Sequence, residues 1–250
     1  FGVVVKDLCD APSNSNSIMT IDEWLGNMEV PGVFGVDTRQ ITKKIRNKGT
    51  VKCVISTEGI SISEAARRCA EAELRGDWMK EVGVKEKVEL KSLADSDEKP
   101  FSVAVMDFGV KGNILTCLRE RNCDLTIYPY GTSAETILPG KPDGIFLTNG
   151  PGDPEEAAEA IEEVKKLISA NEAPMFGICM GHQVLALAFG GKTYKLKYGH
   201  RGGNHGVFDK NTKRSYITSQ NHGFAVQYES IILKGLEITH LHLNDGTVEG

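Results

Sequence analysis

The sequence predicts an α/β fold in two parts: a small N-terminal α/β domain, then a larger domain with a mostly parallel central sheet, helices on both faces and an antiparallel extension. After about residue 100, short apolar segments alternate with amphipathic segments, which is typical of a parallel sheet covered on both faces. A charged stretch over residues 84–100 without sustained apolar periodicity precedes this pattern. A length of 250 residues suits two domains, which we place at residues 1–95, including this charged linker, and 96–250.

The composition is that of an ordinary globular protein, with 40% apolar and 25% charged residues. The formal net charge is −5, and the sequence has no basic arm or patch, so we expect no nucleic-acid partner. No apolar run is long enough to cross a bilayer and no signal-peptide pattern opens the chain. The six cysteines are scattered and form no C-x-x-C pair, so neither a disulfide framework nor a zinc site is expected. We therefore expect a cytoplasmic protein without membrane contact.

The first domain alternates quickly between strand and helix signals. Thr20 and Glu23 have the spacing of a capping box, which predicts a helix beginning there. Ile41 and Ile45 lie one helical turn apart ahead of Gly49, a plausible C-terminal cap. The expected elements are strands over residues 1–5 and 51–55, and helices beginning after Thr20, over 37–46, and over 64–74 with Ser63 as cap.

The second domain is more regular. Four short apolar segments predict strands, at residues 103–106, 125–128, 144–147 and 175–178. Helices are expected between and after them, at residues 112–121, 133–138, 155–168 and 181–189. The remaining segments indicate strands joined by Gly and Asn turns, at residues 192–197, 204–208, 215–218 and 237–242. These last strands form the antiparallel extension.

The most informative motif is Gly177-Ile-Cys-Met-Gly181, where an apolar strand turns into a helix. It has the layout of a nucleophile elbow, in which a sharp turn lifts the middle side chain out of the sheet and flanking glycines allow the strained path. Cys179 would stand at a helix N-terminus, which favours the thiolate, and nearby N–H groups can hold an oxyanion. The alternative is a small buried cysteine at a tight turn. The motif suits acyl transfer through a thioester.

A second Gly-rich segment, Thr148-Asn-Gly-Pro-Gly-Asp-Pro154, follows another apolar strand. Ligands of open α/β sheets bind outside the carboxyl ends of strands, so this loop and the elbow should line one crevice. Gly150 and Gly152 offer N–H groups there. The alternative, a helix entry with Asp153 as cap and Pro154 in the first turn, is compatible with that role.

A third polar segment, residues 219–224, is typical of an Asn-His-Gly turn between two strands. None of the six histidines stands out as a general base for Cys179: His182 starts its helix and would point away from the thiol, and His222 lies in the turn. His240 and His242 alternate on one strand face, but as metal ligands they need a third partner that the sequence does not show. No metal site is therefore predicted.

In this order and spacing, the three segments resemble the class I glutamine amidotransferase family. The matching segments are the strand 103–107, the loop 149–153, the elbow 177–183 and the residues 220–224. Further stretches are similar to one branch, the small glutaminase subunits of carbamoyl-phosphate synthetases: residues 6–8, 36–39, 106–109, 113–115 and 197–205, with Lys111. Because other amidotransferases lack the region before residue 100, the resemblance favours this branch over the modules of other synthetases.

The resemblance implies a role for each matching position. Cys179 corresponds to the nucleophile, and Met180 and Gly150 correspond to the residues whose backbone N–H groups form the oxyanion hole. The positions that hold glutamine correspond to Gly150, Gly152, Met180, Gln183, Asn221, Gly223 and Phe224. The implied reaction hydrolyses glutamine through a thioester and passes ammonia to a large subunit, which joins it to bicarbonate with ATP and Mg²⁺. No cofactor is expected on this chain, which shows no P-loop.

The chain departs from the family at both ends. The family completes its catalytic triad with a His-Pro-Glu motif after the Asn-His-Gly residues, and no histidine here is followed by Pro-Glu. Its opening strands, which carry a serine that contacts glutamine, are also missing. We therefore expect a chain truncated at both ends rather than a catalytically silent homologue that only binds and regulates a large partner. Reading the gene past the codon for Gly250 distinguishes the two.

Overall fold

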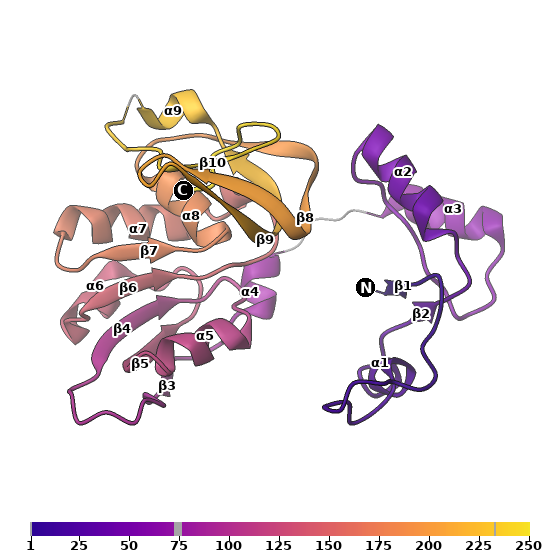
Figure 1. Cartoon of the computed structure of the whole chain (residues 1–250), viewed down its shortest axis with the longest axis horizontal. Helices are drawn as coiled ribbons and strands as arrows, with labels where there is room; N and C mark the ends of the chain where they lie inside the picture. The colour runs from indigo at the N-terminus through magenta and orange to yellow at the C-terminus, as the bar shows by residue number, and fades with distance from the viewer. Residues whose placement is uncertain (1, 73–76, 233) are drawn as a thin grey trace. The chain divides into compact units, whose positions relative to one another are not determined.

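The computed structural model describes residues 2–72, 77–232 and 234–250, and the chain divides into two compact units, residues 1–75 and 76–250 (Figure 1). The sequence pattern predicts a boundary further along the chain, between residues 95 and 96. The difference arises because strand β3 (Val88–Leu90) pairs antiparallel with β5 (Cys123–Tyr128). A strand of three residues is too short to produce a visible periodicity, so its sequence is not distinguished from a charged linker.

The first unit contains a two-stranded parallel sheet and three helices. Strand β1 (Val3–Val4) pairs with β2 (Gly32–Val33), and the helices are α1 (Ile21–Asn27), α2 (Thr38–Lys48) and α3 (Ile62–Glu71). The predicted capping box is confirmed, since Thr20 Oγ1 accepts from Glu23 N at 3.2 Å and Glu23 Oε2 accepts from Thr20 N at 2.8 Å. Gly49 caps α2 with φ 87°, as predicted.

Two predictions for this unit are wrong. Residues 51–55 form no strand among the residues that the structure describes. Helix α3 is capped by Ser61 rather than Ser63, because Ser61 Oγ accepts from Glu64 N at 3.2 Å. Ser61 and Glu64 have the Ser-x-x-Glu capping spacing, which Ser63 lacks.

The second unit is built on a five-stranded sheet in the order β3-β5-β4-β6-β7, parallel except for β3. The remaining strands are β4 (Phe101–Met106), β6 (Gly144–Leu147) and β7 (Met175–Gly177). The helices are α4 (Trp78–Val82), α5 (Gly112–Arg119), α6 (Ala134–Ile137), α7 (Ala158–Ala170) and α8 (Met180–Ala188), with 3₁₀ turns at Leu138–Gly140 and Pro154–Glu156. The predicted mostly parallel sheet is confirmed.

Both faces of this sheet are covered. Val105 packs in one apolar cluster with Leu115 and Leu118 of α5, while its neighbour Met106 packs in another with residues of α6, α7 and α8. Consecutive strand residues point to opposite faces, which is why neighbours in sequence belong to different clusters. This arrangement explains the wholly apolar strand segments.

The antiparallel extension is a three-stranded sheet in the order β10-β8-β9, formed by β8 (Thr193–Asp209), β9 (Arg214–Val226) and β10 (His240–His242), with the short helix α9 (Tyr228–Ile232) (Figure 1). The predicted Asn-His-Gly turn is wrong: His222 lies inside β9 and pairs with His200 of β8. The glycines instead mark two bulges in β8, and Gly199, with φ 75°, is one of these residues.

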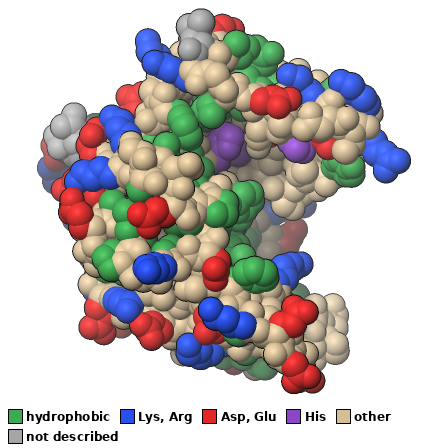
Figure 2. Space-filling view, turned by 90° about the vertical axis from the view of Figure 1, so that its left-hand side faces the viewer, with side chains coloured by type: hydrophobic (Ala, Val, Ile, Leu, Met, Phe, Trp, Pro, Cys, Tyr) green, Lys and Arg blue, Asp and Glu red, His purple; other side chains and the backbone are tan. Residues whose placement is uncertain are grey.

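Within the described residues, no helix is both long enough and apolar enough to span a bilayer. Lysine, arginine and acidic side chains are interspersed over the face shown in Figure 2, as expected from the balanced composition.

Candidate functional site

Cys179 occupies a strained turn between strand and helix. Strand β7 ends at Gly177 and α8 begins at Met180, and Cys179 between them has φ 52° and ψ −104°. A positive φ at a non-glycine residue costs on the order of 1–3 kcal/mol and persists only where the surrounding structure imposes it. The turn has the strand-to-helix position and the strain of a nucleophile elbow.

The two glycines of the motif are sterically required. A Cβ atom at Gly177 would lie 2.6 Å from His182 N, and one at Gly181 would lie 2.6 Å from the carbonyl carbon of Leu147. The same close approach allows two backbone hydrogen bonds, from Ile178 N to Leu147 O at 3.1 Å and from Gly181 N to Thr148 O at 2.9 Å. The elbow is therefore fastened to the end of β6.

The loop 148–154 lies beside the elbow because β6 and β7 are neighbours in the sheet. Thr148 Oγ1 accepts from Phe108 N at 2.9 Å, and Asn149 Nδ2 donates to Gly109 O at 3.1 Å, so the loop is tied to the end of β4 as well. Gly152 has φ 98°, which favours glycine. Asp153 caps the 3₁₀ turn that follows, so the helix-entry interpretation is confirmed and leaves the predicted anion-binding role open.

Residues 221–224 reach the elbow from β9. Gln183 on α8 is buried and donates from Nε2 to Phe224 O at 2.7 Å. The Cys179 thiol makes a weak hydrogen bond, at 3.9 Å, to Asn221 O, and the Asn221 side chain accepts from Arg201 Nη1 at 2.7 Å. The structure thus brings the three predicted segments together. The assignment of Gly150, Gly152, Met180, Gln183, Asn221, Gly223 and Phe224 as ligand contacts remains a prediction.

Burial raises the pKa of the Cys179 thiol, and Glu249 adds to this effect. The Met180 N–H and the charges of Arg201 and Lys111 act in the opposite direction but do not outweigh burial. The position of Cys179 at a helix N-terminus is therefore not enough to bring the pKa of its thiol below the ordinary value in the ligand-free site. No sequence signal indicated an electrostatic role for Arg201 and Lys111, although both lie in stretches that resemble the family.

The structure, like the sequence, assigns no base to Cys179. Among the described residues, no histidine ring is hydrogen-bonded to the thiol. The His222 ring is held by Phe224 O at 2.8 Å and Gln220 Oε1 at 3.2 Å. His182 is enclosed, and burial lowers its pKa.

The charge of Arg201 gives a testable pH dependence. Cys179 alkylation by iodoacetamide, followed by peptide mass spectrometry, should have its midpoint above the ordinary thiol pKa of about 8.5. Arg201→Gln should move the midpoint higher, because the variant loses a positive charge that stabilises the thiolate. Lys197→Gln, also on β8, is the matched control and should leave it unchanged. Equal midpoints for Arg201→Gln and the unmodified protein would contradict this electrostatic account.

Comparisons with known proteins agree with this geometry. Residues 104–250 match the family model described as Glutamine amidotransferase class-I, and residues 1–55 match that of the Carbamoyl-phosphate synthase small chain, CPSase domain. A solved structure described as a GMP synthase protein, from Thermoplasma acidophilum, superposes with a TM-score of 0.50 at 22% identity, covering 58% of this chain and 75% of that one. That likeness supports the fold alone.

Three curated relatives carry the name carbamoyl phosphate synthase small chain. The chain is 55% identical over 249 residues to that of Clostridium acetobutylicum, 46% over 250 to that of Fusobacterium nucleatum and 44% over 249 to that of Bacillus caldolyticus. Each match covers 100% of this chain and, in the same order, 69%, 67% and 66% of the relative, so the chain spans about two thirds of their length. The chain belongs to the carbamoyl phosphate synthase small chain family, and its second unit carries a class I glutamine amidotransferase domain.

Proposed function

We propose that this chain is the glutaminase part of a carbamoyl phosphate synthase. The observation that carries the proposal is the strained Cys179 elbow. It is hydrogen-bonded to the loop 148–154 through Gly181 N and Thr148 O, and to β9 through the Cys179 thiol and Asn221 O. A backbone held in a disfavoured conformation at a nucleophile is typical of a functional site, because neighbouring packing must maintain it.

In the proposed reaction the Cys179 thiolate attacks the carboxamide carbon of glutamine. The oxyanion of the tetrahedral intermediate accepts hydrogen bonds from the backbone N–H groups of Met180 and Gly150. The departing nitrogen takes up a proton and leaves as ammonia, and water then hydrolyses the glutamyl thioester to glutamate and restores the thiol. Binding of the substrate is assigned to Gly152, Gln183, Asn221, Gly223 and Phe224.

The relatives are named small chains, which supports the existence of a larger partner subunit. We propose that the large subunit receives the ammonia and, with ATP and Mg²⁺, makes carbamoyl phosphate from bicarbonate for arginine and pyrimidine biosynthesis in the cytoplasm. The chain itself is proposed to need no cofactor for glutamine hydrolysis. The match of residues 1–55 favours this assignment over the amidotransferase module of another synthetase.

A chloroketone analogue of glutamine tests both the nucleophile and the substrate. Cys179 should be alkylated faster by this analogue than by iodoacetamide, and glutamine should protect it, because recognition of the amino-acid part concentrates the electrophile at the thiol. The exposed Cys9 is the internal control and should show no such preference. Equal rates at the two cysteines, or no protection by glutamine, would favour a catalytically silent homologue.

A further inference from the structure

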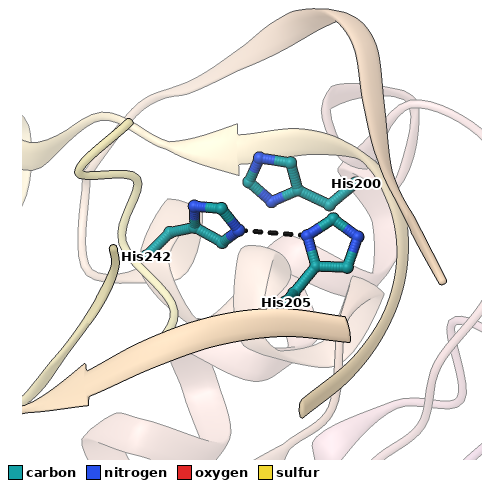
Figure 3. A group of neighbouring side chains, drawn as sticks. All are labelled: His200, His205 and His242. Atoms are coloured by element: carbon teal, nitrogen blue, oxygen red, sulfur yellow. Dashed lines mark hydrogen bonds between the residues drawn. The ribbon is translucent and has the colours of Figure 1, made fainter. Parts of the chain in front are cut away.

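We propose that His200, His205 and His242 form a binding site for one divalent transition-metal ion, with Zn²⁺ as the best-suited ion. His200 and His205 come from β8 and His242 from β10, and one ring nitrogen from each lies within 4.8 Å of the others (Figure 3). Only small areas of histidine surface are visible on the face shown in Figure 2. None of the three histidines is among the predicted substrate contacts, although His200 pairs with His222, which lies between Asn221 and Gly223.

The strand register brings the three rings together. His242 pairs with Val207 on β8, and His205 lies two residues before Val207, so His205 and His242 are diagonal neighbours on one sheet face. The pairing of β8 with β9 is irregular between Gly202 and His205. The side chain of His200 therefore does not follow the regular two-residue alternation that relates His205 to Val207. No metal site was expected from the sequence because His240 and His242 have no third ligand near them along the chain; the structure supplies two from β8.

The distances suit a small metal ion. His205 Nδ1 and His242 Nε2 are hydrogen-bonded to each other at 3.0 Å, so a bound ion would replace this hydrogen bond (Figure 3). Two nitrogens bound to Zn²⁺ at about 2.0–2.1 Å in tetrahedral geometry lie about 3.3–3.4 Å apart, so a widening of a few tenths of an ångström admits the ion. The His200 and His242 rings stack with centroids 4.1 Å apart, and in Figure 3 one nitrogen of His200 lies on the side of the other two rings.

The hydrogen bonding leaves the cluster incomplete without a ligand. His200 Nδ1 is buried and has no hydrogen-bond partner among the described residues, although Glu249 Oε1 lies 3.4 Å away. His205 Nε2 is also buried and unpartnered, but the nitrogen of this ring that faces His242 is Nδ1. A buried polar atom without a partner is destabilising, and such cases in native proteins need an explanation. An ion bound between the rings would use His200 Nδ1.

Asp245 supports the rings from behind. Its Oδ2 is 2.9 Å from His200 Nε2, and its Oδ1 is 3.2 Å from His242 Nδ1. A carboxylate on the far nitrogen of a ligating histidine is the usual outer support of a metal site, because it fixes the tautomer and the ring orientation. With the His200 Nε2 proton directed to Asp245, His200 Nδ1 is free to bind the ion. His242 Nδ1 accepts from Asn244 N at 3.2 Å, so metal binding through His242 Nε2 requires that hydrogen bond to be replaced by one from His242 Nδ1 to Asp245.

The chemistry of the ligands selects the ion. Neutral imidazoles are borderline ligands that suit Zn²⁺ and other late first-row ions, whereas Mg²⁺ and Ca²⁺ require oxygen ligands. The carboxylates of Asp245 and Glu249, the latter 3.4 Å from His200 Nδ1, would balance the charge of the ion.

The test is Zn²⁺ binding to the metal-free protein, measured by competition with a chromophoric chelator. We expect one Zn²⁺ per chain, a higher thermal midpoint when it is bound, and no binding of Mg²⁺ at the same concentration. His242→Gln should weaken binding at least about 100-fold, since even loss of an outer partner costs 10–100-fold. The matched control is His240→Gln, two residues away on the same strand, which should bind like the unmodified protein.

Further measurements keep the proposal falsifiable. If His242→Gln loses its fold by circular dichroism, His205→Gln replaces it in the comparison. X-ray absorption of the Zn²⁺-bound protein should show nitrogen and oxygen neighbours at about 2.0–2.1 Å and no sulfur. Substoichiometric binding, equal affinity of the His242→Gln and His240→Gln variants, a Zn–S distance, or binding abolished by His222→Gln and retained by His242→Gln would overturn the assignment.

Discussion

Replacing Cys179 with serine is expected to abolish glutamine hydrolysis by the complete gene product in complex with its large subunit, by at least about 10³-fold in kcat. Serine preserves the size of the side chain, but its hydroxyl is a far weaker nucleophile than a thiolate and no base contacts this position among the described residues. The measurement is glutamate release from glutamine, with carbamoyl phosphate formation followed in parallel.

The same variant should retain carbamoyl phosphate synthesis from free ammonia, because the proposed route needs this chain only to supply that ammonia. Cys123→Ser is the matched control: burial raises the pKa of this thiol too, but Cys123 lies in β5 without the strained turn. It should keep glutamine-dependent activity. Unchanged glutaminase activity in Cys179→Ser would rule out Cys179 as the nucleophile.

Gly181→Ala is expected to have the second largest effect, because it fills space that the elbow needs. The added methyl group would overlap the Leu147 carbonyl group, which is backbone at the end of β6 and cannot rotate away. Overpacking of this kind costs about 1–3 kcal/mol and occasionally more, and relief by movement of α8 would also displace Cys179. We expect a lower urea midpoint for the second unit and loss of glutaminase activity together.

Gly112→Ala is the control for this variant. Gly112 also stands in the first turn of a helix that follows a strand of the same sheet, but a Cβ atom there meets nothing within 4 Å. Alanine should therefore be neutral or slightly stabilising, since it removes the backbone freedom of glycine in the unfolded chain. Equal urea midpoints for the two variants would show that the close approach at Gly181 does not constrain the elbow.

Much of the second unit was predictable because its signals are local. Four apolar segments identified β4 to β7, and the glycines around Cys179 identified the elbow, since close packing of a helix start on a strand end leaves no room for other residues. The order of the segments indicated a common crevice, because parallel strands end at the same edge of a sheet.

The predictions that were wrong concern elements whose structure depends on pairing between distant segments. Strand β3 is recognisable only through its partner β5. Glycine and asparagine indicated turns near residues 199–204 and 221–223, where long paired strands with bulges use the same residues. The register of β8 brings the charge of Arg201 close to Cys179 and the rings of His200 and His205 close to His242. No local sequence pattern specifies this register.

The central claim is that Cys179 forms a glutamyl thioester. Rapid acid quenching of the complete gene product with its large subunit during turnover of glutamine, followed by peptide mass spectrometry, measures this directly. The account predicts a glutamyl adduct on the peptide that contains Cys179, appearing with glutamine and absent from the Cys179→Ser variant. Steady release of glutamate with no adduct on Cys179, or with the adduct on another residue, would contradict it.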